Sequence, residues 1–352
     1  MKFHPLKVLE VKPETEYAVA VTFNVPEDLN QEFSYLPGQY LTLKFTLNGE
    51  EQRRAYSMCS SPIEENITIG VKRVENGLVS NHINDHVKEG GSIEIMPPQG
   101  NFRVACQEEQ QKKYILFGGG SGITPLLSIA KTVMSKEPKS SVKLLYANER
   151  LDTVMFKSQI DALQENYSNR FKVEHIINNP PTDWQGKRGL LDTDTIKAAV
   201  QELGTQLNAA ECYICGPSGM MELVENELVS LDFPSDKIHI ERFTAAKSDS
   251  AKAAEINTST QEAKAKINFF GEEKNIAIPK GTSILQALQN QGIDAPFSCQ
   301  SGVCSTCIAL LTKGEVAMEF TEALDDDEIK EGLILTCQAK CITDEVEVIF
   351  EH

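Results

Sequence analysis

Three cysteines lie close together in the last quarter of the sequence, and a fourth follows a short apolar run. Cys299, Cys304 and Cys307 have the spacing C-x4-C-x2-C, and Cys337 is the fourth. Four thiolates at this spacing are typical of a plant-type 2Fe-2S cluster. Gly302 and the small residues beside it allow backbone N–H groups to approach the inorganic sulfurs. We therefore predict that these four cysteines are the ligands of a 2Fe-2S cluster.

Zinc is the alternative metal for these thiols. Zinc sites usually contain two C-x2-C pairs, and here only Cys304 and Cys307 form one. Cys341 could contribute to a second pair, but Cys299 would then have no role. The spacing favours the cluster, with zinc as the alternative and Cys341 as a spare thiol.

The composition narrows the classes of protein that the chain could belong to. Its 352 residues are enough for two or three domains. No apolar run approaches the roughly 18 residues of a membrane span, and no signal peptide is recognisable at the start. Nine cysteines without such a signal fit reduced thiols in the cytoplasm. The net charge of −17 argues against nucleic acid or an anionic membrane as a partner. The acidic run 325–328 is expected to be solvated, and it could steer a basic redox partner.

Residues 1–107 have the pattern of an antiparallel barrel. Short segments at 17–23, 40–46 and 67–73 alternate or run apolar, and Pro and Gly separate them. Strands that are short and regularly spaced favour a closed β-barrel.

In residues 108–244 the sequence pattern changes to one of alternating strands and helices. The expected strands are 114–117, 142–147, 171–177 and 211–215, and the expected helices are 126–134, 156–163 and 220–231. This alternation predicts an α/β domain with a parallel sheet covered on both faces.

The remainder is predicted to be a linker over 245–264 and a small α+β domain over 265–352. The linker is rich in Ala, Ser, Lys and Thr and has no apolar periodicity. The small domain is expected to contain strands at 265–270, 275–278 and 346–350, and a helix at 283–291.

Two polar motifs in the first domain suit a flavin nucleotide. In the run Arg54-Ala-Tyr56-Ser57, arginine suits a pyrophosphate, tyrosine offers an aromatic face, and serine can donate to a ring nitrogen. Taken alone, this motif could also be a surface arginine beside a core tyrosine. The segment Gly77–Ser80 is expected to be a turn whose amides and hydroxyl receive phosphate.

Two glycine-rich segments each join a strand to a helix in the second domain. They are Gly118–Pro125 and Cys215–Gly219. Such a segment places free N–H groups and a positive helix end at the carboxyl edge of the sheet, where α/β folds bind anionic ligands. The first segment is neither G-x-G-x-x-G nor a P-loop, so a tight turn without a ligand is the alternative interpretation.

The motifs in this order resemble the ferredoxin–NADP reductase superfamily. The subgroup with the same layout carries a plant-type ferredoxin domain of β-grasp fold at its C-terminus. Within it, the chain is most similar to reductase components of phenylacetyl-CoA epoxidases. Steroid hydroxylase reductases and the reductases of the hybrid-cluster protein share the layout. The resemblance implies an FAD-binding barrel, an NAD(P)-binding domain and a 2Fe-2S domain.

The resemblance also implies roles for individual residues. The residues expected to bind FAD are Arg54 at the pyrophosphate, Tyr56 and Ser57 at the flavin ring, Val71 and Lys72 along it, and Gly77 and Ser80 near the phosphates. Those expected at the nicotinamide nucleotide are Gly119, Gly120, Thr124, Cys215 and Gly216, with Glu241 and Phe243 closing the second domain beside the flavin. The residues predicted to be catalytic are Ser57, Cys215 and Glu241.

The choice of nucleotide rests on the residues that follow the strand ending at Ala147. Arg150 could pair with a 2′-phosphate, and Glu149 could bind a ribose diol. We expect NADPH, with NADH as the alternative.

The implied function is electron transfer. FAD accepts a hydride from NAD(P)H and passes electrons singly to a cluster that has a potential of about −400 mV. We expect a terminal oxygenase, such as phenylacetyl-CoA epoxidase, as the acceptor. The alternatives are the hybrid-cluster protein, a steroid or aromatic-ring hydroxylase or, from another class, a non-catalytic role as a flavin- or zinc-binding interaction module.

Overall fold

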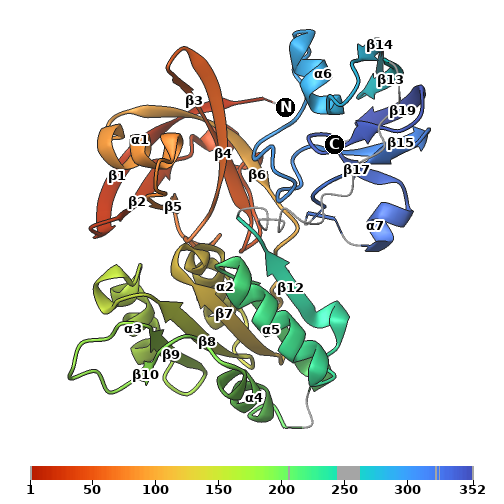
Figure 1. Ribbon diagram of the computed structural model, residues 1–352. Coiled ribbons are helices and arrows are strands. Elements are labelled where there is room, and N and C mark those ends of the chain that lie inside the picture. The colour runs from red at the N-terminus through yellow and green to blue at the C-terminus, as the bar shows by residue number, and fades with distance from the viewer. Residues whose placement is uncertain (1, 205–206, 244–261, 322, 325, 351–352) are drawn as a thin grey trace. The chain divides into compact units, whose positions relative to one another are not determined.

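The computed structural model describes residues 2–204, 207–243, 262–321, 323–324 and 326–350 (Figure 1). The chain divides into two compact units, Lys2–Glu241 and Arg242–His352, and each is described by itself. Most of the linker predicted over 245–264 lies outside the described residues. Within the described part, no helix is long and apolar enough to cross a membrane.

The first domain is a six-stranded antiparallel barrel. Its strands are β1 (His4–Thr15), β2 (Ala18–Asn24), β3 (Tyr40–Leu47), β4 (Glu50–Ser57), β5 (Ile67–Lys72) and β6 (Ser92–Gln99), in the order β4-β3-β6-β1-β2-β5. A bridge between Met58 and Ile69 joins the chain just after β4 to β5, the strand at the other end of this order. The predicted antiparallel barrel is therefore confirmed. Helix α1 (Leu78–His86) follows β5 and packs on it.

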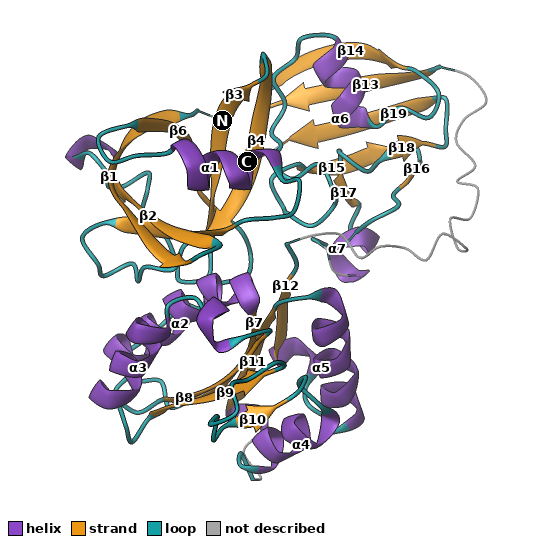
Figure 2. Cartoon of the chain, turned by 60° about the vertical axis from the view of Figure 1, so that its left-hand side comes forward, coloured by secondary structure: helices purple, strands orange, loops and turns teal. Residues whose placement is uncertain are grey.

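The second domain contains a six-stranded parallel sheet. Its strands are β7 (Lys113–Gly119), β8 (Ser141–Asn148), β9 (Phe171–Ile177), β10 (Lys187–Arg188), β11 (Ala210–Cys215) and β12 (Ile238–Glu241), in the order β10-β9-β8-β7-β11-β12. Its helices are α2 (Ile123–Lys136), α3 (Lys157–Asn166), α4 (Thr193–Gln201) and α5 (Ser218–Ser230). Figure 2 shows α2 and α3 on one side of the sheet and α4 and α5 on the other.

The sequence of β7 explains why both faces of this sheet are covered. Tyr114 and Leu116 pack into the cluster that contains the apolar side chains of α2. Ile115 and Phe117, which point the other way, pack with residues of α4 and α5. Because residues 114–117 are all apolar, neither face of the strand suits contact with water, and the strand lies inside a parallel sheet.

The C-terminal unit contains a mixed five-stranded sheet, and the predicted α+β class is confirmed. Its elements are β13 (Ala263–Phe269), β14 (Glu272–Ile278), α6 (Ile284–Asn290), β15 (Ile308–Lys313), β16 (Val316–Ala317), α7 (Asp326–Lys330), β17 (Leu333–Leu335), β18 (Lys340–Cys341) and β19 (Glu345–Phe350), with the sheet order β14-β13-β19-β15-β17. Strand β13 begins at Ala263, two residues before the predicted start of this strand at 265. Ala263, Ala265 and Ile267 are buried, and the small alanines alternating with lysines concealed where the strand begins.

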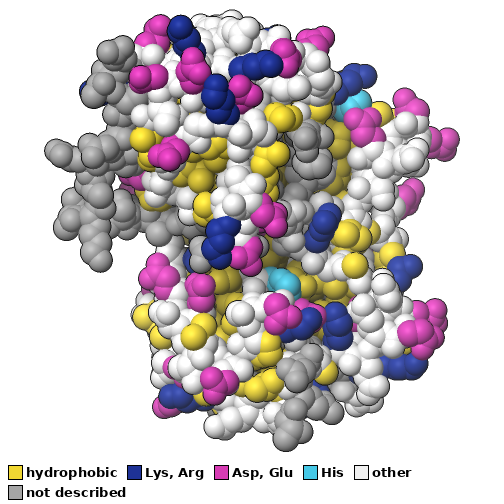
Figure 3. Space-filling view, turned by 90° about the vertical axis from the view of Figure 1, so that its right-hand side faces the viewer, with side chains coloured by type: hydrophobic (Ala, Val, Ile, Leu, Met, Phe, Trp, Pro, Cys, Tyr) yellow, Lys and Arg dark blue, Asp and Glu magenta, His cyan; other side chains and the backbone are white. Residues whose placement is uncertain are grey.

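Buried polar contacts join the barrel to the second domain. The Ser128 hydroxyl of α2 donates to the Ser60 carbonyl at 2.6 Å, and the Ser61 and Thr132 hydroxyls lie 2.7 Å apart. These four residues are 4% exposed or less, so water does not compete for the bonds. Charged side chains of both signs are scattered over the surface among uncharged and hydrophobic ones (Figure 3).

Candidate functional site

The register of two short strands brings the last two predicted cluster ligands together. Strand β15 begins directly after Cys307, and β17 ends two residues before Cys337. Ile308 pairs with Leu335, and the Thr336 N–H donates to the Cys307 carbonyl at 3.1 Å. The chain segments that carry the two thiols are therefore hydrogen-bonded neighbours, although 307 and 337 are far apart in the sequence.

The four thiols form two interacting pairs. The Cys299 N–H donates to the Cys304 sulfur at 3.4 Å, and the Ser301 N–H donates to the Cys299 sulfur at 3.4 Å. A hydrogen bond from the Cys304 thiol, with further bonds from Ser301, lowers the pKa of Cys299 to about 5. Its partner Cys304 has a raised pKa because it donates to that sulfur and is buried.

The second pair repeats this asymmetry. A hydrogen bond from the Cys307 thiol lowers the pKa of Cys337, while the pKa of Cys307 itself is raised by the same bond and by burial. In each pair the protein thus lowers the pKa of one thiol and raises that of the other.

This donor set fits a binuclear cluster. In a 2Fe-2S centre each iron takes two protein sulfurs and shares two inorganic sulfides, so ligands are needed in pairs. Gly302 adopts φ +78°, and a Cβ there would lie 2.7 Å from the Phe320 carbonyl oxygen. The loop therefore folds closely only with glycine at this position.

The flavin residues predicted from the first polar motif lie on strand β4 itself. Arg54 and Tyr56 are two positions apart, and Ser57, which is buried, is the last residue of the strand. Arg54 is exposed and donates to the Arg53 carbonyl at 2.7 Å. Burial raises the pKa of Tyr56, so its phenol stays protonated. A rigid strand places an arginine, an aromatic ring and a hydroxyl in the predicted order.

The segment Gly77–Ser80 is the start of a helix, and the prediction of a turn was wrong. Gly77 is the N-cap of α1, and Ser80 lies in the first helical turn. The Ser80 hydroxyl accepts the Val74 N–H at 3.1 Å, so it organises the loop before the helix. The helix end still presents free N–H groups of the kind that bind phosphate, and phosphate binding by Gly77 and Ser80 stays a prediction.

The two glycine-rich segments of the second domain pack directly against each other. A Cβ on Gly122 would overlap the Cys215 carbonyl oxygen, and one on Gly119 would lie 2.5 Å from Pro217. The Cα of Gly119 lies 3.0 Å from where a Cβ on Gly216 would be. Glycine is needed at these positions because two backbones approach at the carboxyl edge of the sheet.

Buried side chains fix the shape of the first glycine segment. The Tyr146 hydroxyl donates to the Gly120 carbonyl at 2.9 Å, and the Thr124 hydroxyl donates to the Ser121 carbonyl at 3.0 Å. Gly120 has φ +52°, a conformation that favours glycine. The predicted role of Thr124 therefore includes holding the loop, and its hydroxyl is already engaged there.

Lys72 brings the two domains of the site together. Its ammonium lies 3.5 Å from where a Cβ on Gly120 would be. Lys72 ends β5, on which Val71 is buried, and Gly120 belongs to the predicted nucleotide loop. The strand expected to run along the flavin thus meets the loop expected to hold the nicotinamide nucleotide.

The remaining predicted residues are placed as follows. Cys215 ends β11, is fully buried and pairs in register with Glu241 of β12. Burial and the Glu241 charge raise the pKa of Cys215 well above its ordinary range, so the thiol is neutral. Phe243 belongs to the other compact unit and is 39% exposed. Arg150 makes a two-pronged ion pair with Asp152 at 2.9 and 3.1 Å.

Sequence reasoning missed Gly70, Phe156 and Glu14, which lie where the two domains meet. A Cβ on Gly70 would be 2.7 Å from Thr124 and 2.8 Å from the Phe156 ring. Glycine inside the strand pattern 67–73 was an available signal, because it often marks a close approach of another segment. Phe156 and Glu14 gave no such signal.

Family comparisons cover each part of this arrangement. Residues 6–104 match the family described as an oxidoreductase FAD-binding domain, 116–226 match an oxidoreductase NAD-binding domain, and 267–341 match a 2Fe-2S iron-sulfur cluster binding domain. One component of the 1,2-phenylacetyl-CoA epoxidase of Escherichia coli (strain K12) is 35% identical, over 99% of this chain and 98% of its own.

The chain belongs to the family of ferredoxin-reductase-type flavoproteins with a C-terminal 2Fe-2S domain.

Other relatives also align with this chain over nearly its full length. The ferredoxin reductase component of the 3-ketosteroid-9-alpha-monooxygenase of Rhodococcus rhodochrous is 32% identical over 98% of this chain and 96% of its own. A solved structure of phthalate dioxygenase reductase is 25% identical and covers 99% of this chain and 98% of its own, with a TM-score of 0.59. The predicted family, enzyme class and cofactors are thus confirmed: this oxidoreductase has FAD-, NAD(P)- and 2Fe-2S-binding domains.

Proposed function

We propose that this reductase supplies electrons to an oxygenase, with phenylacetyl-CoA epoxidase as the first candidate. The observation that carries the proposal is that the strand register brings Cys337 next to the loop that contains the other three thiols. The chain also aligns along nearly its full length with reductase components of oxygenases. We also propose the functional division 1–107 for FAD, 108–244 for the nucleotide and 265–352 for the cluster, with 245–264 as the linker.

The residues divide the work between binding and orientation. Arg54 and the α1 N-terminus would hold the FAD phosphates, and Tyr56 and Ser57 would orient the ring. The paired glycine loops at Gly119 and Gly216 would receive the nicotinamide nucleotide. When bound, FAD takes two electrons as hydride and the cluster takes them one at a time. The chain must keep the reacting atoms close and water out.

The unequal pKa values within each thiol pair would favour binding of the cluster by the C-terminal domain. Cys299 and Cys337 are the more acidic members, so they would bind iron as thiolates with little proton cost. The backbone N–H groups of Cys299 and Ser301, which donate to the Cys304 and Cys299 sulfurs, would stabilise added negative charge on reduction.

The substitution Cys304→Ser tests this assignment. It should abolish reduction of one-electron protein acceptors by NAD(P)H and lower the iron and acid-labile sulfide content. Reduction of ferricyanide, which needs only the flavin, should continue at the wild-type rate. Cys341→Ser is the matched control and should retain the cluster. Loss of both activities, or retention of both by Cys304→Ser, would contradict the proposed route.

The partner is tested by exchanging oxygenases. We expect the purified reductase to support turnover of a phenylacetyl-CoA epoxidase faster than that of a 3-ketosteroid 9α-hydroxylase or of the hybrid-cluster protein. The two relatives named above differ by only a few per cent in identity to this chain, so the rates must decide. Faster turnover with either alternative would replace the proposed partner.

For the nucleotide we propose NADPH, with NADH as the second candidate. Both oxygens of Glu149 accept hydrogen bonds, from the side-chain amides of Asn178 and Asn179. Arg150 is exposed, and water screens its surface pair with Asp152, so a 2′-phosphate can replace this carboxylate. Arg150→Ala should lower kcat/KM for NADPH about tenfold and leave NADH within twofold. Equal losses with both nucleotides would contradict this preference.

A further inference from the structure

Helix α3 begins with a residue in an unfavourable backbone conformation. Phe156, the N-cap residue, has φ +57° in the left-handed region, which is uncommon for a bulky side chain. This conformation is strained and persists only where the surroundings enforce it. The helix has no side-chain cap of its own, no acidic residue in its first turn, and starts with Lys157. Its positive end therefore lacks local compensation.

The compensation comes from a different domain. Oε2 of Glu14, on barrel strand β1, accepts the Phe156 N–H at 3.0 Å. Oε1 of Glu14 is buried, with no hydrogen-bond partner among the described residues. Burial raises the pKa of Glu14, opposed by this bond and by the charges of Lys12 and Lys131. A carboxylate at a helix N-terminus makes a charge-assisted bond and favours the helix dipole.

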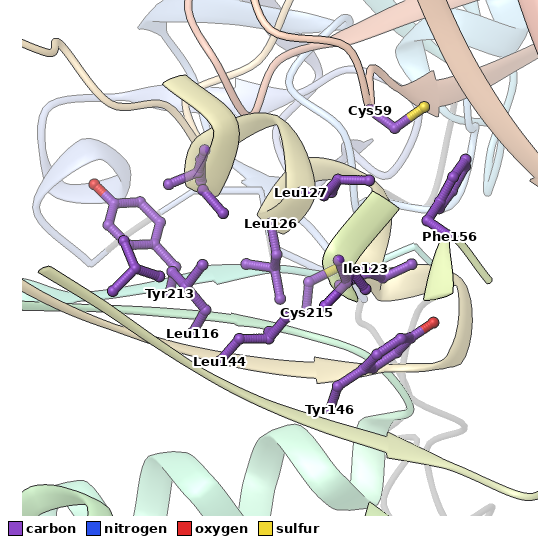
Figure 4. Packing of buried hydrophobic residues seen from close by; sticks show 14 of the residues in the cluster. Cys59, Leu116, Ile123, Leu126, Leu127, Leu144, Tyr146, Phe156, Tyr213 and Cys215 are labelled. Carbon is purple, nitrogen blue, oxygen red and sulfur yellow. The ribbon is translucent and has the colours of Figure 1, made fainter. Parts of the chain in front are cut away.

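The Phe156 side chain lies next to Gly70, where the barrel meets the second domain. It is fully buried, and Figure 4 shows it in the packed cluster on the side of Cys59. Its ring atom Cζ lies 2.8 Å from where a Cβ on Gly70 would be, and Thr124 lies 2.7 Å from the same point. Gly70 is two residues before Lys72 on β5, and Thr124 is in the first turn of α2. The ring and Thr124 therefore both approach β5 at Gly70.

From these contacts we infer that Glu14 is a positioning residue for hydride transfer. By holding the Phe156 amide, it fixes the ring as a spacer that sets how closely β5 approaches the glycine loop of α2. The distance between flavin and nicotinamide depends on that approach, and a displacement of about 1 Å in such a geometry can cost about 100-fold in rate. Glu14 touches neither reacting group. The inference rests on NAD(P)H reducing the flavin, not on which oxygenase accepts the electrons.

The test compares three full-length FAD-loaded variants in anaerobic stopped-flow flavin reduction. Glu14→Ala should lower the limiting rate at least about tenfold while the nucleotide Kd stays within twofold, because the loops that bind the nucleotide are intact. Glu14→Gln keeps an acceptor oxygen at the same reach and should retain most of the rate. Glu10→Ala, an exposed carboxylate on the same strand, should match wild type.

Hydrogen exchange gives a readout that does not depend on activity. Amides at the start of α3 should exchange faster in Glu14→Ala, and near the wild-type rate in Glu14→Gln. Should Glu14→Ala not fold, Glu14→Asp replaces it, since one methylene fewer removes the reach and should give the same losses.

Two results would overturn the inference, and a third concerns the proposed function. A wild-type limiting rate in both Glu14→Ala and Glu14→Asp would show that the contact has no positioning role. A raised nucleotide Kd with an unchanged limiting rate would show a binding role instead. If wild-type flavin itself is not reduced by NAD(P)H, the proposed function fails.

Discussion

Gly302 determines whether the cysteine loop can fold around its ligands. Its φ of +78° and its contact with the Phe320 carbonyl both exclude a larger residue. A Cβ there would also lie 3.1 Å from Gln338, whose amide nitrogen is 3.7 Å from the Cys337 sulfur. One residue without a side chain thus permits the first three ligands to approach the fourth.

We predict that Gly302→Ala lowers the cluster content of the protein to less than half. The substitution adds a left-handed alanine, at about 1–2 kcal/mol, and a steric overlap with Phe320. Gly271→Ala is the control, because Gly271 also has a positive φ, +96°, but nothing lies within 4 Å of its added Cβ. Iron and acid-labile sulfide per chain are the measurement. If both variants lose the same amount of cluster, backbone strain alone explains the loss and the overlap with Phe320 does not contribute.

A second prediction for a single residue concerns Glu211, a buried residue of strand β11. Burial by itself would raise its pKa, but hydrogen bonds from His239 and Lys112 and the charges of Lys112 and Lys237 outweigh it and lower the pKa to about 2. The distances are 2.9 Å to His239 and 2.9 Å to Lys112. A depressed carboxyl pKa stabilises the fold fully above the unfolded value of 4.5, and this contribution is lost as pH falls from 4.5 toward 2.

Glu211→Gln should therefore lower stability at pH 7 by about 2 kcal/mol and flatten the dependence on pH below 4.5. Trp184, the only tryptophan of the chain, packs against the core of the same domain and reports its unfolding in urea by fluorescence. Glu202→Gln removes an exposed partner of Lys143 and should change little. An unchanged pH profile in Glu211→Gln would contradict the assignment.

At the scale of elements, the proposed nucleotide site consists of two loops that pack too closely to leave room for a side chain where they meet. The β7–α2 loop at Gly122 lies against the β11–α5 loop at Cys215, where parallel strands end. Neighbouring parallel strands place successive loops at one edge, so the two glycine segments share a surface. The proposed nucleotide site would depend on both loops at once.

Gly122→Ala should raise the nucleotide Kd at least about tenfold and destabilise the domain by about 1–3 kcal/mol, because its Cβ would overlap the Cys215 carbonyl. Gly219→Ala, in the first turn of α5 with nothing within 4 Å, should leave binding unchanged and stabilise the helix by up to about 1 kcal/mol. Titration with NADP⁺ and with NAD⁺ measures the nucleotide Kd of both variants. Wild-type affinity in Gly122→Ala would show that the loops can separate without loss.

The sequence predicted those features that local pattern determines. Cysteine spacing named all four thiols that the structure brings together, and apolar runs located strands such as 171–177 to the residue. The first turn of α1 was predicted as a turn because glycine and serine suit both, and only the packing on β5 distinguishes them. The contact between Glu14 and Phe156 joins residues 142 positions apart, and no periodicity or turn chemistry reports such a pairing.

At the scale of the whole molecule, net charge governs encounters with other redox molecules. The chain carries −17, and Figure 3 shows acidic side chains spread over the face in view. Such a charge attracts a basic protein surface and repels small anions, and salt screens both effects over about 10 Å at 0.1 M. The exposed Glu319 directly precedes Phe320, which contacts the cysteine loop, so local charge near the cluster adds to the global field.

Ionic strength should therefore change the rates with two acceptors in opposite directions. Raising salt from about 20 to 300 mM should slow electron transfer to a basic protein partner about tenfold, because attraction is screened, and should speed reduction of the ferricyanide anion. Glu319→Lys and Glu108→Lys change net charge equally, but Glu108 is exposed in the other compact unit. We expect Glu319→Lys to slow the partner reaction more. If the two substitutions slow the partner reaction equally, the net charge of the whole molecule steers the encounter. If salt changes the rate of neither the variants nor the wild type, the partner docks without electrostatic guidance.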